Sequence, residues 1–345
     1  MENGGSNLRK ARHLEACLDD GVDLARDSFG AYRLCYRALP EISLDEVSTG
    51  CAFAGRRISA PLLIGPMTGG LGEPFLKINR NLALAAQELG LPLSLGSMRV
   101  ALESPAARES FMVRSLAPDV PLVSNLGLVS LNHGLSLPAA AELAGEMDAD
   151  VFGLHLNPLQ EVIQQGGDTD FRGLEERLRE VLAGVGRPVL VKECGGGIAP
   201  PLVARLAALG VDYIDISGAD GTSWAAVEAR LADDPALGEL FADFGLPTAW
   251  ILEHLGPHQK GSARIIAGGG IRNGLQAVKA LALGGHMVSM ARPFLQAAMD
   301  SADEVIRLGQ RFIREMKTAM FLVGARQLEE LGPHLFLGAD GRDGR

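Results

Sequence analysis

Short apolar runs recur along the chain, separated by longer segments in which apolar residues repeat every three to four positions. Eight runs have the length and composition of β-strands: PLLIG (61–65), LPLSLG (91–96), VPLVSN (120–125), VFGLHL (151–156), PVLVKE (188–193), VDYIDIS (211–217), RIIAG (264–268) and HMVSM (286–290). Helical periodicity ending near glycine fills the gaps, as in FLKINRNLALAAQELG, LPAAAELAGEMDA, PPLVARLAALG and LQAVKALALGG. Eight alternating strand and helix units predict an α/β fold, a closed (β/α)8 TIM barrel.

The regular spacing is interrupted at both ends of the chain and once inside it. Residues 1–60 are predicted to form an N-terminal arm and entry segment, 61–330 the barrel and 331–345 a C-terminal tail, whose end GADGRDGR (338–345) is expected to fray. Strands six and seven are separated by an insertion, roughly residues 219–262, which is predicted to form a lid or outer wall over the barrel mouth.

Composition narrows the classes of protein. A chain of 345 residues with 47% hydrophobic content can bury a large core, and no apolar run reaches the length of a membrane span or the pattern of a signal peptide. We therefore expect a soluble, cytoplasmic protein without a membrane partner. The net charge of -10 argues against nucleic-acid binding, although a local basic pocket can still hold an anion. The four cysteines have no metal-binding spacing.

Every predicted strand ends in polar residues or glycines. The loops after the strands of a (β/α)8 barrel form its active-site face, so these ends converge on one rim. Loops are often polar and glycine-rich for no functional reason, but eight such ends together favour a site. MTGG (67–70) carries two glycines where a turn needs one, which indicates close approach of the backbone to a flat ligand.

Two motifs indicate a phosphate-bearing ligand. GGGIRNG (268–274) and ARPF (291–294) follow strands seven and eight, where such barrels bind phosphate, and Asn273 is predicted to cap the next helix. A bare glycine turn is the alternative. Lys192 ends strand five and needs an anionic partner, either the ligand or the adjacent Glu193.

A phosphate site beside a glycine-lined, lysine-bearing rim fits flavin mononucleotide, FMN. Thr68 is predicted to lie near the reactive N5 of the ring and Asn125 near its pyrimidine end. Lys192 would stabilise negative charge on the reduced ring, which favours reduced FMN as the working state.

A second ligand site is indicated by HLNPLQE (155–161), because His155, Asn157, Gln160 and Glu161 leave strand four together. Glu161 is a candidate Mg²⁺ ligand, to be completed by phosphate oxygens and water. A lone histidine at the end of a strand is more often structural than functional, but these neighbours favour a functional role for His155. The arm carries Arg9, Lys10 and His13, which could be no more than a solvated basic face. Together with Arg99 and His155 they could instead surround a diphosphate and form a cationic site.

Taken together, these motifs resemble the type 2 isopentenyl-diphosphate isomerases, a flavin-dependent family that interconverts isopentenyl and dimethylallyl diphosphates. The resemblance spans about residues 8–326 and includes RKARHL, MTGG, GSMRVAL, SNLG, HLNPLQE, SGADGTSW, GGGIRNG, ARPFL and MFLVGA. The combination of HLNPLQE, MTGG and RKARHL is specific to this family, whereas GGIRNG occurs in several phosphate-binding barrels.

The resemblance implies a role for each matching position. FMN would be held by Met67, Thr68, Gly69, Ser97, Asn125, Lys192, Ser217, Thr222, Gly268, Gly269, Gly270, Ala291 and Arg292. The substrate would be held by Arg9, Lys10, His13, Arg99, His155, Asn157 and Gln160, with Glu161 on Mg²⁺ and with Gln160 and Glu228 handling protons. NADPH or NADH is the implied reductant, and a homo-oligomer, a tetramer or octamer, the implied assembly.

Two positions depart from the family pattern. SGADGT places Asp220 where the family usually has glycine, beside the predicted flavin phosphate, so that a like charge would weaken cofactor binding unless Asp220 turns away. Cys194, in KECGGG, is expected to act as a small apolar residue.

Three other functions remain as alternatives. A flavin-dependent 2-hydroxy-acid oxidase or dehydrogenase needs a His and Arg pair near strands six and seven, which SGADGTSW does not supply. A nucleotide dehydrogenase sharing GGIR needs a cysteine on a mobile loop, whereas Cys194 lies in a strand-end motif. A non-catalytic flavin or phosphate sensor predicts a bound cofactor and no shift of a double bond.

Overall fold

The computed structural model describes residues 3–338, with the backbone alone for residues 3–7, 257 and 258. Within this range, nine strands pair in parallel in the order β5-β4-β3-β11-β10-β9-β8-β7-β6. They are β3 (Leu62–Ile64), β4 (Leu93–Ser94), β5 (Leu122–Val123), β6 (Leu126–Gly127), β7 (Phe152–Leu156), β8 (Val189–Glu193), β9 (Tyr213–Asp215), β10 (Arg264–Ala267) and β11 (Met287–Met290). All eight predicted runs contain strand, and the predicted α/β class and (β/α)8 barrel are confirmed.

The ninth strand, β6, lies just beyond the third predicted run (120–125) and is separated from β5 by Ser124 and Asn125. β5, inside the predicted run, pairs with β4, whereas β6 pairs with β7. Between them, the hydroxyl of Ser124 lies 3.3 Å from both the carbonyl oxygen of Val151 and the amide nitrogen of Gly153. A Cβ on Gly153 would lie 2.0 Å from the carbonyl oxygen of Ser124, so this close approach requires glycine. A bridge between Val123 and Val151 completes the ring.

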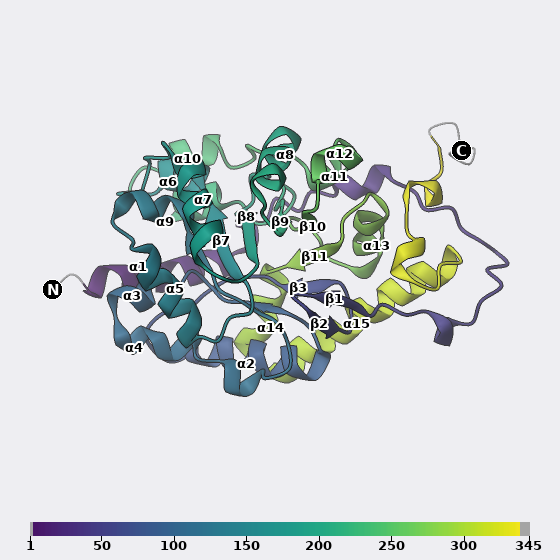
Figure 1. Cartoon of the computed structure of the whole chain (residues 1–345), viewed down its shortest axis with the longest axis horizontal. Coiled ribbons are helices and arrows are strands. Elements are labelled where there is room, and N and C mark those ends of the chain that lie inside the picture. Colours follow the sequence, from purple (N-terminus) through teal and green to yellow (C-terminus); the bar gives the residue numbers. More distant parts are fainter. Residues whose placement is uncertain (1–2, 339–345) are drawn as a thin grey trace.

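Helices surround the sheet, with α2, α14 and α15 packed together along one side (Figure 1). They are α1 (Asn3–Leu18), α2 (Glu73–Leu89), α3 (Arg99–Glu103), α4 (Pro105–Arg108), α5 (Leu137–Glu146), α6 (Pro158–Ile163), α7 (Leu174–Gly184), α8 (Pro200–Leu209), α9 (Trp224–Leu231), α10 (Ala236–Leu240), α11 (Thr248–Glu253), α12 (Pro257–Lys260), α13 (Gly274–Ala282), α14 (Arg292–Asp300) and α15 (Ala302–Leu322). The four segments with predicted helical periodicity form α2, α5, α8 and α13. No helix of the described chain is long and apolar enough to cross a membrane.

A hairpin blocks the end of the barrel where the strands begin. It consists of β1 (Cys51–Phe53) and β2 (Arg56–Ile58), and its Phe53 and Ile58 pack into a buried cluster with one apolar residue from each of several strands. The Tyr213 hydroxyl accepts a hydrogen bond from the backbone amide of Ala54, at 3.0 Å. Because this end is filled, a ligand can reach the barrel only from the end where the strands stop.

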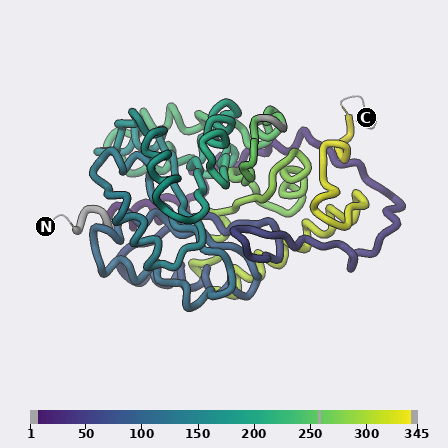
Figure 2. The backbone as a smooth tube through the Cα atoms, viewed as in Figure 1, coloured from purple at the N-terminus to yellow at the C-terminus, as the bar shows by residue number. Residues whose placement is uncertain are grey.

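The N-terminal segment wraps around the barrel instead of extending from it. After α1, the chain makes a long excursion to the side of the molecule that holds the C-terminal residues (Figure 2). There Leu34 bridges to Phe336, and the amide of Cys35 donates to the carbonyl of Leu335 at 2.7 Å. The expected fraying of 338–345 falls almost entirely on residues outside the described range. The division into segments at residues 60 and 330 stays a prediction.

The insertion between strands six and seven contains α9, α10, α11 and α12. Of these, α9 packs against both α1 and α6. The insertion therefore forms a wall beside the open end of the barrel, continuous with the arm.

Candidate active site

Two adjoining cavities lie at the open end of the barrel within the described residues. They enclose about 740 and 1040 Å³ of empty space, including their mouths, which is the size range of cofactor sites. The glycine-rich cavity is lined by the loops after β9, β10 and β11, and the basic cavity by α1 and the loops after β4, β6 and β7. Both cavities are lined by Pro66, Met67, Lys192, Cys194 and Trp224. Two ligands bound here would therefore be in contact.

The glycine-rich cavity has the groups that a phosphate requires. Gly269 and Gly270 have φ angles of +92° and +74°, and a Cβ on Gly269 would lie 2.1 Å from the carbonyl oxygen of Gly218. The Asn273 side chain accepts from the amide of Gln276 at 2.9 Å, so the predicted cap of α13 is confirmed. The side chains of Arg272 and Arg292 also line the cavity and supply positive charge.

Lys192 lies where the two cavities meet. Its ammonium donates to the backbone carbonyl of Glu193 at 2.5 Å and lies 3.8 Å from the sulfur of Cys194. The Glu193 carboxylate instead accepts hydrogen bonds from the backbone amides of Gly195, Gly196 and Gly197. The alternative, an ion pair between the side chains of Lys192 and Glu193, is therefore wrong.

The charge of Lys192 is set by its surroundings. Burial lowers its pKa, but the surrounding acidic groups outweigh burial and hold the pKa above the usual value. Lys192 is therefore a cation in the wall that the glycine-rich and basic cavities share. Burial raises the pKa of Cys194 to about 11, so its thiol is neutral and apolar, in line with the expectation for this position.

The positive charge of the basic cavity comes from the arm and from α3. Lys10 donates to the carbonyl of Ser97 at 3.2 Å, and Arg99 forms ion pairs with Asp168 and Glu103. His155 contributes no charge, because burial, Lys192 and Lys10 lower its pKa to about 3. Its Nδ1 lies 2.9 Å from the side-chain oxygen of Asn125. His155 therefore offers the cavity a neutral, oriented imidazole.

A continuous chain of hydrogen bonds joins the basic cavity to α9. Nε2 of His13 lies 2.9 Å from a carboxylate oxygen of Glu228, and the Gln160 amide donates to the same oxygen at 2.8 Å. The Asn157 amide donates to Gln160 at 3.1 Å and to Glu161 at 2.7 Å. Glu228 is almost completely buried, with 4% of its side chain exposed. A buried carboxylate held by an imidazole and an amide is equipped to accept or hold a proton.

Comparisons with known sequences and structures identify the family and the fold. The model of the FMN-dependent dehydrogenase family matches residues 145–337. Isopentenyl-diphosphate delta-isomerase of Synechococcus sp. is 47% identical over 303 residues, covering 86% of both chains. The same-named protein of Deinococcus radiodurans is 42% identical and covers 94% of this chain and 96% of its own. The chain belongs to the isopentenyl-diphosphate delta-isomerase family.

Solved structures with the same fold include distant flavoproteins. A mandelate oxidase variant with (S)-mandelic acid has a TM-score of 0.64 at 20% identity, covering 94% of this chain and 95% of its own. A flavocytochrome b2 variant with pyruvate bound has a TM-score of 0.71 at 15% identity, covering 94% and 82%. These similarities are evidence for the barrel fold alone.

The residues that family resemblance assigned to FMN divide into four groups. Those lining the glycine-rich cavity are Met67, Lys192, Ser217, Thr222, Gly269, Gly270, Ala291 and Arg292. Ser97 and Asn125 line the basic cavity instead, and Thr68 lines a small space beside His13 and Trp224. Gly69 and Gly268 face protein: a Cβ on Gly69 would lie 2.2 Å from the Phe111 ring, and one on Gly268 would lie 2.3 Å from the Asp215 carboxylate.

The residues assigned to the substrate of the isomerase family are brought together without exception. Arg9, Lys10, His13, Arg99, His155, Asn157, Gln160 and Glu161 all line the basic cavity. Trp224 was missed, although it ends the SGADGTSW motif; its ring packs edge-on against His13, with centroids 5.6 Å apart. Asp23 was also missed, and nothing in its local sequence marks it, because its partners are about 250 residues away.

Asp220, which departs from the isomerase family pattern, turns away from the glycine-rich cavity. One of its carboxylate oxygens accepts from the hydroxyl of Ser28 at 2.6 Å and from the amide of Thr248 at 2.7 Å. The other oxygen is buried without a partner in the described structure. Asp220 therefore fastens the arm to the insertion, and the concern that its charge faces the phosphate site is removed.

Replacing Asp220 by alanine is expected to destabilise the protein by about 1–3 kcal/mol, because the amide of Thr248 and the hydroxyl of Ser28 lose their buried acceptor. Urea unfolding of the flavin-free protein measures this. Asp233→Ala, at an exposed position of the same insertion, is the matched control and should be neutral. An Asp220→Ala variant as stable as the parent would show that these two bonds contribute nothing.

Proposed function

We propose that this protein interconverts isopentenyl and dimethylallyl diphosphates, using FMN in the glycine-rich cavity and binding the diphosphate in the basic cavity. The observation that supports this most is the buried network of His13, Glu228 and Gln160, which opens into a basic cavity sharing its wall with the flavin-sized one. A phosphate site alone would fit many barrels. A proton-handling network adjoining both a flavin site and a diphosphate site fits this isomerisation.

The reaction needs protons and no net electrons. One proton is added at the terminal carbon of the alkene and another is removed from the neighbouring methylene, so that the double bond moves by one position. When bound in its reduced form, FMN supplies an electron-rich ring that stabilises positive charge developing on the alkene and a site that can carry a proton. NADPH or NADH is the proposed reductant.

The protein's own groups position the alkene and move the second proton. Gln160 is held at both ends, since its amide oxygen accepts from Asn157 and its amide nitrogen donates to Glu228. An amide is a poor acid or base, so Gln160 orients the substrate. Glu228, which lines neither main cavity, takes or returns the proton through His13, which lines the basic cavity. Lys10, Arg9 and Arg99 bind the diphosphate, and Trp224 excludes water from the shared wall.

Mg²⁺ is proposed to bind through Glu161 and the substrate. Among the side chains that the structure describes, no three of His, Cys, Asp or Glu are clustered as a metal cage. This suits Mg²⁺, which binds through one or two carboxylates together with phosphate oxygens. The side-chain oxygen of Asn157 is buried without a partner beside Glu161, so a further acceptor is present at this position.

Glu161→Gln is expected to raise the Mg²⁺ concentration needed for half-maximal turnover by about tenfold, because a charged ligand is replaced by a neutral one. Glu142→Gln, on the exposed face of α5, serves as the control. An unchanged Mg²⁺ dependence would exclude Glu161 as a ligand.

The product assay tests the function directly. Purified protein is incubated without oxygen with isopentenyl diphosphate, FMN, Mg²⁺ and NADPH, and dimethylallyl diphosphate is measured. We expect the product to form only when FMN and reductant are both present. A yellow, FMN-loaded protein that forms no product would favour the flavin sensor; oxidation of a 2-hydroxy acid would favour the oxidase.

Substrate affinity should fall as the pH rises through about 8, because burial and the neighbouring Arg9 lower the pKa of Lys10 to about 8. Below this pH Lys10 is charged and binds the diphosphate; above it the charge is lost, and kcat/KM for isopentenyl diphosphate should decrease. Lys10→Arg keeps its charge and should flatten this limb of the pH profile. The same limb in both proteins would assign it to another group.

A further inference from the structure

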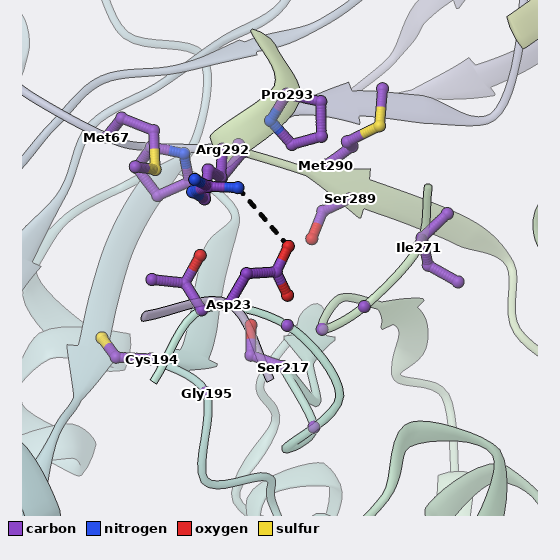
Figure 3. Close-up of a pocket in the computed structure, with 18 of the residues that line it drawn as sticks. Asp23, Met67, Cys194, Gly195, Ser217, Ile271, Ser289, Met290, Arg292 and Pro293 are labelled. Atoms are coloured by element: carbon purple, nitrogen blue, oxygen red, sulfur yellow. Dashed lines mark hydrogen bonds and ion pairs between the residues drawn. The ribbon is translucent and has the colours of Figure 1, made fainter. Parts of the chain in front are cut away.

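A carboxylate occupies the part of the glycine-rich cavity that is built for an anion. Asp23 comes from the arm, just after the short 3-10 turn Asp20–Val22, and lies inside the cavity near Arg292 and Ser217 (Figure 3). One carboxylate oxygen lies 2.6 Å from the Arg272 guanidinium and the other lies 3.5 Å from that of Arg292. Both cavity arginines are therefore already paired with the protein's own anion.

The chain on either side of Asp23 is tied to the same loops. Asp23 forms a bridge with Thr222, the Leu24 amide donates to the carbonyl of Gly221 at 3.0 Å, and the Ser223 amide donates to that of Val22 at 2.8 Å. On the other side, Arg292 donates to the carbonyl of Cys17, near the end of α1. These bonds hold the backbone of Asp23 beside the glycine-rich cavity.

We propose that Asp23 is a specificity-determining residue of the cofactor site, one that competes with the phosphate of FMN for Arg272 and Arg292. This inference rests on the proposed flavin-binding function. A phosphate entering the cavity must either displace Asp23 or lie beside it, and both cost electrostatic energy. Asp23 therefore lowers the affinity for FMN but not for riboflavin, which has the same ring and sugar alcohol and lacks the phosphate.

Asp23→Asn tests the proposal with a side chain of the same shape and no charge. FMN and riboflavin are titrated separately into the flavin-free protein, and binding is followed by flavin fluorescence. We expect FMN to bind about tenfold more tightly to the variant, with riboflavin changed less than about twofold. Asp45→Asn is the matched control, because Asp45 is exposed in the N-terminal segment and lines neither cavity. Its affinities should match those of the parent.

A second measurement uses the unaltered protein and does not depend on how the variant folds. Hydrogen exchange at the Leu24 amide, which bonds to Gly221, should become faster when FMN binds if Asp23 is displaced. Weaker FMN binding by Asp23→Asn, or an equal gain for riboflavin, would overturn the proposal. Those outcomes leave the isomerase function intact, whereas failure of both proteins to bind FMN would reject both.

Discussion

Glu228→Gln is expected to reduce kcat for isomerisation by about 10²- to 10³-fold, because general acid–base groups contribute on this scale. The substitution keeps the shape of the side chain and its hydrogen bond to Gln160, while it removes the group that can take a proton. KM for isopentenyl diphosphate and the affinity for FMN should change little, since Glu228 lines neither of the two main cavities. Steady-state kinetics on FMN-loaded protein measure kcat and KM separately.

The control for Glu228→Gln is Glu239→Gln, which makes the same change on the exposed surface of the same insertion. It should keep full activity. If Glu228→Gln kept more than a third of the parental kcat, the proton would have to pass through another group, and Gln160 with His13 would be reduced to positioning the substrate.

Much of the barrel could be predicted because its strands are short, buried on both sides and bounded by glycine or polar residues. The break between β5 and β6 could not, because Ser124 reads as an ordinary strand residue and its bond to Val151 depends on a neighbouring strand. The start of a helix could be predicted from the sequence where one residue determines it, as Asn273 does by capping α13.

The candidate site was also predictable only in part. Residues at strand ends, such as Lys192 and His155, were accessible because the fold itself directs them to one rim. Their charge states were not, since the pKa of His155 depends on burial and on two lysines far apart in sequence. The neutral His155 was unexpected for this reason. The orientation of Asp220 was likewise decided by Ser28 and Thr248, both distant along the chain.

Lys192→Met is the second substitution expected to have a large effect, lowering kcat by about 100-fold. The ammonium of Lys192 lies at the wall that the two cavities share, and its pKa is held above the usual value by the surrounding acidic groups in spite of burial. Methionine fills the same space without charge. The variant should bind oxidised FMN, but its bound flavin should be harder to reduce, because a cation that favours negative charge on the reduced ring is gone.

The flavin midpoint potential separates this role from a structural one. A lower potential together with lower kcat and a nearly unchanged KM is the expected result for Lys192→Met. Lys77→Met is the matched control, since Lys77 also donates to a backbone carbonyl, that of Met299, but lies away from both cavities. If the potential of Lys192→Met equalled that of the parent while its stability fell, Lys192 would be holding the loop after β8 through its bond to Glu193, and the charge itself would have no part in catalysis.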